Sequence, residues 1–226
     1  MGETKDTRTR IIESFSLDGC PLCSMLRRDE LDILYRWIGQ SNNAAKNSGL
    51  IRKILDAGGF CNFHFWRFQE MSTHYASANI GAQLIDKLLE ILRTNKQECP
   101  GNALKYREKT SDAWLAECPL CFELREKESG YLKELLAILK HEENRLRYEN
   151  SCGLCIPHYV RVIEYIDDDS LMGFLYETQI SQLEGIKTNA ESFISKRHPS
   201  QRWKQTEDEK KVWFQAIEKI TGRSRA

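Results

Sequence analysis

The sequence predicts an all-α protein in which a helical metal-binding repeat occurs twice, as two pseudo-symmetric units, followed by one further helix. Three observations predict this fold class. Apolar residues recur at helical spacing along much of the chain. No stretch of four to eight residues combines strict apolar-polar alternation with β-branched side chains, as a strand would. One pattern of cysteine and histidine occurs twice in the same order.

The helical spacing is clearest in three apolar stripes, one in each part of the expected fold. Residues three and four apart lie on one face of a helix, so each stripe predicts a helix that buries one side. The stripes are Leu84, Ile85, Leu88, Leu89 and Leu92; Leu132, Leu135, Leu136 and Leu139; and Val212, Trp213, Ala216, Ile217 and Ile220.

The first repeat spans about 14–98 and is expected to hold four helices. Gly58-Gly59 ends the second of these helices as a pair of C-cap glycines. A short helix at about 103–115 then leads into the second repeat. The four expected helices run from the first Cys-Pro-Leu-Cys to Ile38, over 43–57, from Cys61 to Met71, and over 75–95.

The second repeat spans about 112–198 and repeats this plan. A helical stretch over 119–149 is expected, with an interruption at Ser129-Gly130, and helices follow over 154–166 and from the turn at 167–169 to about Arg197. The last helix covers 206–221 and packs on the repeats. Thr206 and Glu209 form a capping-box pattern at its start, and Gly222 ends it.

The repeated pattern is Cys-Pro-Leu-Cys followed, 34 to 38 residues later, by Cys-x-x-His. Cys-x-x-Cys places two sulfurs one helical turn apart, and proline suits the first turn of a helix. The helix dipole there favours the thiolates that a metal needs. Two closed tetrahedral sites are therefore predicted, one in each repeat. Site one is Cys20, Cys23, Cys61 and His64, and site two is Cys118, Cys121, Cys155 and His158.

Cys152 complicates the second site, because it could replace His158 to give four thiolates. The first repeat has Gly58 at the corresponding position, so duplication favours His158 and leaves Cys152 as an alternate ligand. Cys99 has no partner at ligand spacing, and His74, His141 and His198 are expected at the surface or at helix caps.

The cysteines have two interpretations other than metal binding. The thiols could be buried small side chains beside a core histidine, but eight residues would then share a register by chance. A thiol–disulfide oxidoreductase would need a strand before the motif and a βαβ context, which the sequence lacks.

The metal is zinc or iron. Three thiolates and one imidazole suit Zn²⁺ and also a [4Fe–4S] cluster, and both give the site the same net charge. Zinc is the more common occupant of paired Cys-x-x-Cys motifs. An aromatic collar near Cys61 would suit a dry cluster pocket or a plain core equally well; it consists of Phe60, Phe63, Phe65, Trp66 and Phe68.

Composition limits the remaining function classes. The 33 basic residues balance the 33 acidic ones, so the net charge gives no reason to expect binding to nucleic acid or to an anionic membrane.

The first ten residues resemble no secretory signal, and no apolar run is long enough to span a bilayer, so we expect a cytoplasmic protein. No nucleophile–base set, phosphate loop or dinucleotide fingerprint occurs, so an enzymatic activity is uncertain and not favoured.

The segments CPLC, GFCNFHFW, CPLC and CGLCIPHY, with the tryptophan-containing last helix, resemble an uncharacterised prokaryotic family, a domain of unknown function found mostly in anaerobes. The resemblance covers nearly the whole chain and implies a duplicated helical metalloprotein. Cys99 and Cys152 depart from the pattern. The favoured function is a structural zinc protein that serves as a binding or adaptor module for an unidentified protein partner.

Two alternatives remain. The first is an iron–sulfur protein for electron transfer or oxygen sensing, to which the anaerobic association adds weight. The second is a zinc protein that binds nucleic acid through Trp66-Arg67-Phe68 and the segment from Arg197 to Trp203.

Overall fold

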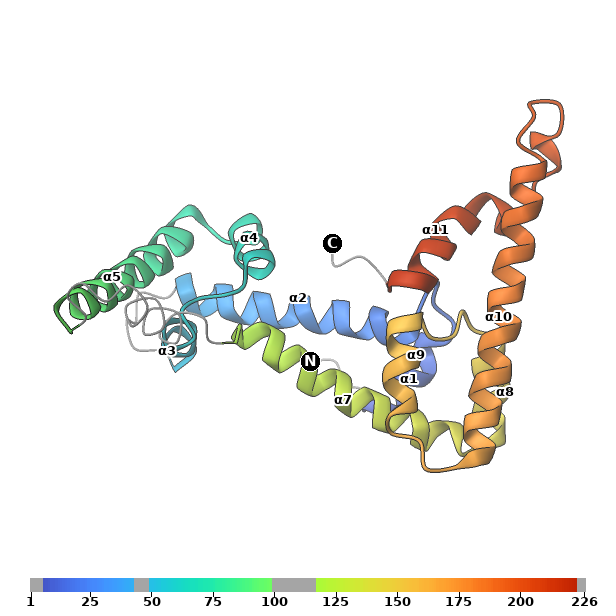
Figure 1. Ribbon diagram of the computed structural model, residues 1–226, viewed down its shortest axis with the longest axis horizontal. Helices are drawn as coiled ribbons and strands as arrows, with labels where there is room; N and C mark the ends of the chain where they lie inside the picture. The colour runs from blue at the N-terminus through green and yellow to red at the C-terminus, as the bar shows by residue number, and fades with distance from the viewer. Residues whose placement is uncertain (1–5, 43–48, 99–116, 223–226) are drawn as a thin grey trace. The chain divides into compact units, whose positions relative to one another are not determined.

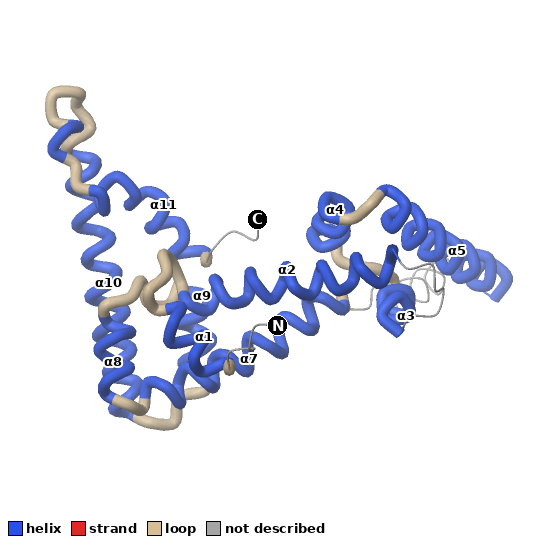
Figure 2. The backbone as a smooth tube through the Cα atoms, turned by 180° about the vertical axis from the view of Figure 1, so that it is seen from behind, coloured by secondary structure: helices blue, strands red, loops and turns tan. Residues whose placement is uncertain are grey.

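The computed structural model describes residues 6–42, 49–98 and 117–222, and every regular element in these ranges is a helix (Figures 1 and 2). The predicted all-α fold is confirmed for them. The expected helix at 103–115 and the start of the one at 43–57 lie outside the described residues. The elements are α1 (Thr7–Ser14), α2 (Pro21–Asn42), α3 (Gly49–Asp56), α4 (Asn62–Met71), α5 (His74–Glu98), α7 (Pro119–Leu139), α8 (Glu142–Glu149), α9 (Ile156–Ile163), α10 (Asp169–Ser195), η1 (Arg202–Lys204) and α11 (Glu207–Thr221).

Helix α1 is an addition to the expected fold, in which the first helix begins at the first Cys-Pro-Leu-Cys. The side chain of Asp6 caps it by accepting a hydrogen bond of 2.7 Å from the backbone N–H of Thr9. Ile11 is fully buried. The cap and the burial of Ile11 both stabilise this short helix.

The expected interruption at Ser129-Gly130 is wrong, because α7 runs through both residues and the chain breaks at Lys140-His141 instead. Side chains of the next helix explain this end. The amide of Asn144 donates to the carbonyl of Ile138, and Nε of Arg145 donates to that of Leu139. These bonds satisfy carbonyls that a helix leaves without partners in its last turn.

The chain divides into two compact units whose bounds differ from the predicted repeats. Unit 1 combines residues 1–28 with 127–226, and unit 2 consists of residues 29–126. The boundaries fall inside α2 and α7, so each unit takes residues from both copies of the sequence pattern. The repeats at 14–98 and 112–198, and their pseudo-symmetry, stay predictions about the sequence.

The core of unit 1 packs α1, the start of α2, the later part of α7 and helices α8 to α10 together. Tyr148 is fully buried in this core, and its ring lies 5.6 Å from that of Phe15 in an edge-on contact. Its hydroxyl accepts a hydrogen bond from the backbone N–H of Leu154, next to Cys155. This hydrogen bond attaches the segment before α9 to the core. Other buried members include Leu22, Met25, Leu132, Leu135, Leu139, Val162, Leu171 and Leu175.

The core of unit 2 is an aromatic cluster on α2 and α4, with aliphatic residues of α3 and α5. The ring of Phe60 lies 5.5 Å from that of Trp37 and 5.7 Å from that of Phe68. Phe60 and Phe68 of the expected aromatic collar are buried, whereas Trp66 is exposed. The aliphatic members are Ile51, Ile54, Ile80 and Leu84.

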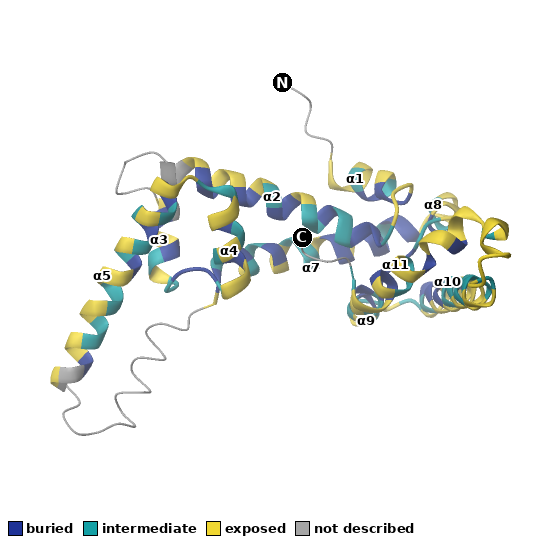
Figure 3. Cartoon of the chain, turned by 90° about the horizontal axis from the view of Figure 1, so that it is seen from above, coloured by how far each residue is buried: buried dark blue, intermediate teal, exposed yellow. Residues whose placement is uncertain are grey.

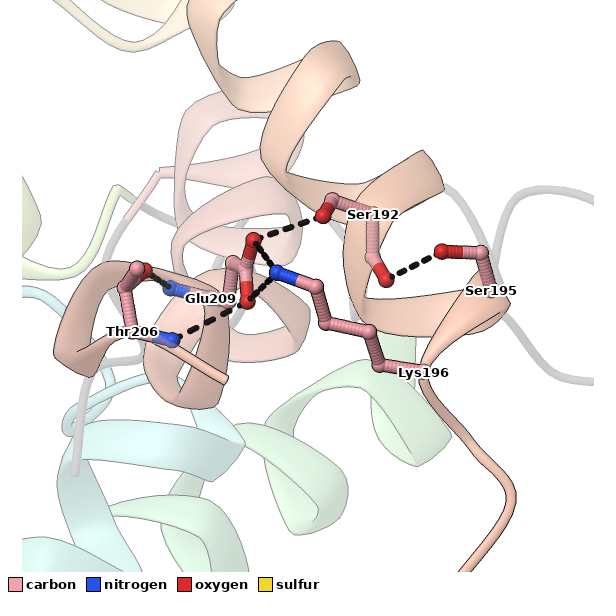
Figure 4. A network of polar contacts seen from close by, with 5 residues as sticks. All are labelled: Ser192, Ser195, Lys196, Thr206 and Glu209. Atoms are coloured by element: carbon pink, nitrogen blue, oxygen red, sulfur yellow. Dashed lines mark hydrogen bonds and ion pairs between the residues drawn. The ribbon is translucent and has the colours of Figure 1, made fainter. Parts of the chain in front are cut away.

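Helix α11 folds back beside α10 and also contacts α9 (Figure 1). The predicted capping box is confirmed, since Thr206 and Glu209 bond each other's backbone N–H groups. Figure 4 shows that Glu209 also binds Lys196 and Ser192 at the end of α10. The predicted apolar stripe of α11 is only partly buried: Val212 faces inward, while Trp213, Ile217 and Ile220 are exposed (Figure 3 shows burial along the chain).

Within the described ranges, no helix combines the length and the apolar character that crossing a membrane requires.

Candidate metal centres

The structure gathers all eight predicted ligands into two clusters, but it pairs them differently from the prediction. Each Cys-Pro-Leu-Cys joins the Cys-x-x-His of the other repeat, so the expected pairing within a repeat is wrong. In each cluster the four donor atoms lie within 4.8 Å of one another. Site A, in unit 1, is Cys20, Cys23, Cys155 and His158; site B, in unit 2, is Cys61, His64, Cys118 and Cys121.

The expected pairing is wrong because motifs that are close along the chain need not be close in space. Helices α2 and α7 begin at the two Cys-Pro-Leu-Cys motifs and are 22 and 21 residues long. Each helix carries the chain away from its motif before the next motif follows. Closing a longer loop adds little entropic cost, since each doubling of loop length costs about 0.6 kcal/mol. Duplication of the sequence pattern does not determine which Cys-Pro-Leu-Cys motif lies beside which Cys-x-x-His motif.

The first cysteine of every motif stands at the start of a helix. Cys61 and Cys155 are the N-cap residues of α4 and α9, with nearly identical extended backbone angles. Cys20 and Cys118 directly precede α2 and α7, and their carbonyls accept the first helical hydrogen bonds. Two helix N-termini therefore meet at each site, and their dipoles favour thiolates.

Site A is compact and largely buried. Nδ1 of His158 lies 3.4 Å from Sγ of Cys20, 3.4 Å from Sγ of Cys23 and 3.2 Å from Sγ of Cys155. The sulfurs of Cys23 and Cys155 are 3.7 Å apart. One imidazole nitrogen thus faces all three thiols.

Site B has the same arrangement. Nδ1 of His64 lies 3.3 Å from Sγ of Cys61 and of Cys121, and 3.6 Å from Sγ of Cys118. The sulfurs of Cys61 and Cys121 are 3.8 Å apart. His64 is fully buried.

The other imidazole nitrogen of each histidine faces a glutamate. Nε2 of His64 lies 3.4 Å from Oε1 of Glu30, and Nε2 of His158 lies 3.3 Å from Oε1 of Glu128. A carboxylate behind a histidine fixes the ring and makes the ligand nitrogen more basic, as is usual for histidines that bind metals. Glu128 also pairs with Arg161.

Sequence reasoning missed both glutamates, although a signal for them exists. Glu30 follows Cys20 by ten residues, and Glu128 follows Cys118 by ten. Each glutamate therefore continues the helix that begins with one Cys-Pro-Leu-Cys, yet each supports the histidine of the other site. A search for acidic residues at equal register in the two repeats would have found them.

The pKa shifts of the ligands indicate how their charges balance. Burial disfavours the charged form of His64, but hydrogen bonds to Cys118 and Glu30 outweigh it and raise its pKa to about 9. Burial also opposes charge on Cys118, yet bonding to His64 and to backbone N–H groups lowers its pKa to about 6.

Site A follows the same rule. Burial is outweighed by hydrogen bonds to Cys20, Cys23 and Glu128, which raise the pKa of His158 to about 12. The pKa of Cys20 is lowered despite its burial, because the neighbouring thiols and His158 stabilise its thiolate. Each cluster therefore favours a thiolate beside an imidazolium, and a metal that binds there displaces protons.

Cys152 lies outside the four-donor set of site A. Its carbonyl accepts a hydrogen bond of 3.0 Å from Nζ of Lys219 on α11. The end of α11 also reaches the site, because a Cβ atom at Gly222 would lie 3.5 Å from the sulfurs of both Cys23 and Cys155. Cys99 lies outside the described residues, and His74, His141 and His198 are exposed.

The donor chemistry of both clusters fits a metal. Three sulfurs and one imidazole nitrogen, converging within 4.8 Å and backed by a carboxylate, form a closed coordination set. Such a set can hold a metal and fasten chain segments to one another.

Comparisons with known proteins give a family and no activity. A search of curated proteins found no match, and a search of solved structures found none. One family model matches residues 8–226, nearly the whole chain. The protein therefore belongs to a family described as a family of unknown function, DUF6062.

Proposed function

We propose that this protein is a helical zinc protein in which two structural metal sites hold together a binding module. The proposal rests on one observation above all. In both clusters three cysteine sulfurs surround a single imidazole nitrogen, and all four donors lie within 4.8 Å of one another.

The spacing of the sulfurs supports a single ion in each site. A tetrahedral zinc with Zn–S bonds of about 2.3 Å places its sulfurs about 3.8 Å apart. The sulfurs of Cys23 and Cys155 are 3.7 Å apart, and those of Cys61 and Cys121 are 3.8 Å apart. A [4Fe–4S] cluster binds each ligand to a different iron, which requires a wider set of donors.

The closed donor sets favour a structural role. A catalytic zinc keeps a coordination position for water or substrate, whereas each of these clusters supplies four protein ligands. Each ion would join segments distant in sequence, 20–23 with 155–158 and 61–64 with 118–121. Because such binding is coupled to folding, the metal would contribute directly to stability.

Metal analysis of protein purified without oxygen tests the proposal. We expect two equivalents of zinc and no absorption band in the visible range. A broad band near about 400 nm that dithionite bleaches would overturn the zinc assignment in favour of an iron–sulfur protein for electron transfer or sensing. Protein purified with neither metal, and unable to take up zinc, would overturn both.

The role as a binding module is supported by α11, whose exposed face is apolar. Trp213, Ile217 and Ile220 are 60%, 57% and 63% exposed and lie at helical spacing. Exposed apolar patches of this kind commonly mark protein interfaces. We expect Trp213→Ser with Ile217→Ser to abolish co-purification of a defined partner while leaving the metal content unchanged. Leu146→Ser, at a residue equally exposed on α8, is the matched control.

Nucleic-acid binding receives less support, because Phe68 is fully buried and unavailable for stacking on a base. Trp66 and Trp203 are exposed. Salt-dependent binding of an oligonucleotide that is lost in Trp66→Ala and Trp203→Ala would favour that function over a protein partner.

A further inference from the structure

Helix α11 is attached to the rest of unit 1 at both of its ends, and the two attachments differ in kind. At its start, the carboxylate of Glu209 binds Lys196 and Ser192 at the end of α10, with no metal ligand involved (Figure 4). At its end, Lys219 and Gly222 lie against the segments that carry site A. The last turn of α11 is therefore the part of the helix that a metal can affect.

Lys219 is buried in this second attachment, with only 5% of the residue exposed. Its Nζ donates to the carbonyl of Cys152 at 3.0 Å and to Oε1 of Gln182 at 2.8 Å. Both acceptors are neutral, and within the described part of the chain no carboxylate lies at ion-pair distance from Nζ. Burying a charge costs much less when an opposite charge lies nearby, so the ammonium needs a counter-charge from another kind of group.

Site A supplies that counter-charge when it holds zinc, because three thiolates, one neutral imidazole and Zn²⁺ carry a net charge of −1. Lys219 shares the wall of one cavity, of about 220 Å³, with the ligands Cys20 and Cys155. Burial lowers the pKa of Lys219 to about 8, whereas the thiolates of Cys20 and Cys155 act in the opposite direction. The ammonium therefore lies within electrostatic reach of two ligands of site A.

The backbone at the end of α11 reaches the same site. A Cβ atom at Gly222 would lie 3.5 Å from the sulfurs of both Cys23 and Cys155, which is an ordinary van der Waals separation. The backbone N–H of Gly222 bonds to the carbonyl of Glu218, so Gly222 closes the same helical turn that carries Lys219. One turn of α11 thus brings a buried cation and a close backbone contact to the ligands of site A.

We propose that the metal at site A holds the last turn of α11 in place, with Lys219 as the positioning residue that balances the charge of the metal–thiolate group. This inference rests on the zinc site of the proposed function and gives that site a regulatory role. Metal binding and attachment of α11 strengthen each other, because coupling between two binding events is reciprocal. Loss of the metal from site A releases the last turn, and the exposed apolar face of Trp213, Ile217 and Ile220 then loses its fixed position.

Hydrogen exchange of the full chain, followed by mass spectrometry, tests the release of α11. The double variant His158→Ala with Cys23→Ser removes two donors of site A, and His64→Ala with Cys121→Ser is the matched control at site B. We expect the amides of residues 216–222 to exchange about 5 to 150 times faster in the site A variant, the range typical of coupled binding. Residues 131–139, in the core of unit 1, should stay protected, and the site B variant should leave 216–222 unchanged.

A second variant keeps all metal ligands and so does not depend on the folding of a ligand variant. Lys219→Met removes the charge and keeps much of the side-chain volume. By reciprocity it should weaken zinc binding at site A by about 5-fold to 150-fold. Competition with a chelator measures this in the site B variant, where only site A binds metal. Glu209→Gln is the control, because it loosens the other end of α11 without changing the charge beside site A, and it should weaken zinc binding much less.

The outcomes separate the possibilities. If residues 216–222 stay protected after site A loses its metal, α11 is held without the metal and the proposal is overturned. Equal loss of protection at 131–139 would also overturn it, because the metal would then stabilise all of unit 1. If Lys219→Met weakens zinc binding no more than Glu209→Gln does, the charge of Lys219 has no role. A wild-type chain that binds no zinc would instead overturn the proposed function, which metal analysis establishes separately.

Discussion

Sites A and B hold the same four donors, yet their surroundings differ. At site A the carboxylate of Glu128 contacts both His158 and Arg161. The end of α11 lies against the sulfurs of Cys23 and Cys155, and the metal ligands Cys20 and Cys155 also line a cavity. At site B the histidine and its glutamate are both buried, with side chains 0% and 5% exposed. The donor set determines which metal fits, and the surroundings determine how readily it exchanges. We therefore expect a metal at site B to exchange more slowly than a metal at site A.

The largest effect should come from removing ligands in pairs. Cys20→Ser with Cys155→Ser damages site A alone, so one metal equivalent should be lost. Cys20→Ser with Cys61→Ser damages both sites, and both equivalents should be lost, because these residues belong to different clusters. Elemental analysis of the purified variants measures the outcome. If the double variant Cys20→Ser with Cys61→Ser loses only one metal equivalent, these two cysteines belong to the same site. That result would support pairing within each repeat and contradict the structure.

A smaller effect should follow from changing the glutamates behind the histidines. Glu30→Gln should weaken metal binding at site B, and Glu128→Gln should weaken it at site A, each by about tenfold to a hundredfold. We expect Glu30→Gln to have the larger effect, because the side chains of His64 and Glu30 are almost completely buried at site B. At site A, Glu128 pairs with the partly exposed Arg161, so water can reach that carboxylate more easily. Competition with a chelator measures both affinities. Equal loss at both sites in either variant would refute the assignment.

The fold class and the ligands could be predicted from sequence because both depend on local spacing. Helical periodicity marks α5 and α7, Thr206 with Glu209 marks the start of α11, and Cys-x-x-Cys marks a candidate metal site at a helix start. Each of these signals lies within a few turns of the chain. The pairing of the motifs depends on how long helices pack, which no short pattern records.

The same limit explains why the buried face of α11 differs from the predicted one. Its apolar stripe predicts a helix correctly, but the expectation that the apolar side is the buried one is wrong for most of the stripe. In the structure, Glu209, Glu218 and Lys219 are buried, while Trp213 and Ile217 are exposed. A polar buried face is stable only when its groups find partners, as Glu209 does with Lys196 and Ser192.

A further contrast between the sites concerns Gly222, which lies against site A alone. Its φ of +81° belongs to the region that glycine adopts without strain. Gly222→Ala should cost about 1–3 kcal/mol of stability and speed metal release from site A but not from site B. Urea unfolding and metal transfer to a chelator measure the two effects. Gly173→Ala, in the middle of α10 where added volume meets open space, is the control and should not destabilise.

The smallest effect should be a pH dependence confined to the attachment of α11 to α10. Hydrogen bonds from Lys196 and Ser192 lower the pKa of Glu209 from 4.5 to about 2. A carboxylate with a lowered pKa in the folded state stabilises the fold fully above about pH 4.5, and this contribution is lost as the pH falls towards 2. Glu209→Gln should therefore be less stable than the wild type at pH 7, with a difference that shrinks in acid.

Urea midpoints of the two chains, compared at each pH, isolate this effect from metal release, because both chains keep all eight ligands. Glu207→Gln is the matched control, since Glu207 pairs with Lys210 on the exposed surface of the same helix and should matter less. A difference between wild type and Glu209→Gln that is as large at pH 3 as at pH 7 would show that Glu209 acts through its shape and not its charge. In that case the loss would come from the missing second acceptor, because Glu209 accepts from Ser192 at Oε1 and from the backbone N–H of Thr206 at Oε2, whereas glutamine offers only one oxygen.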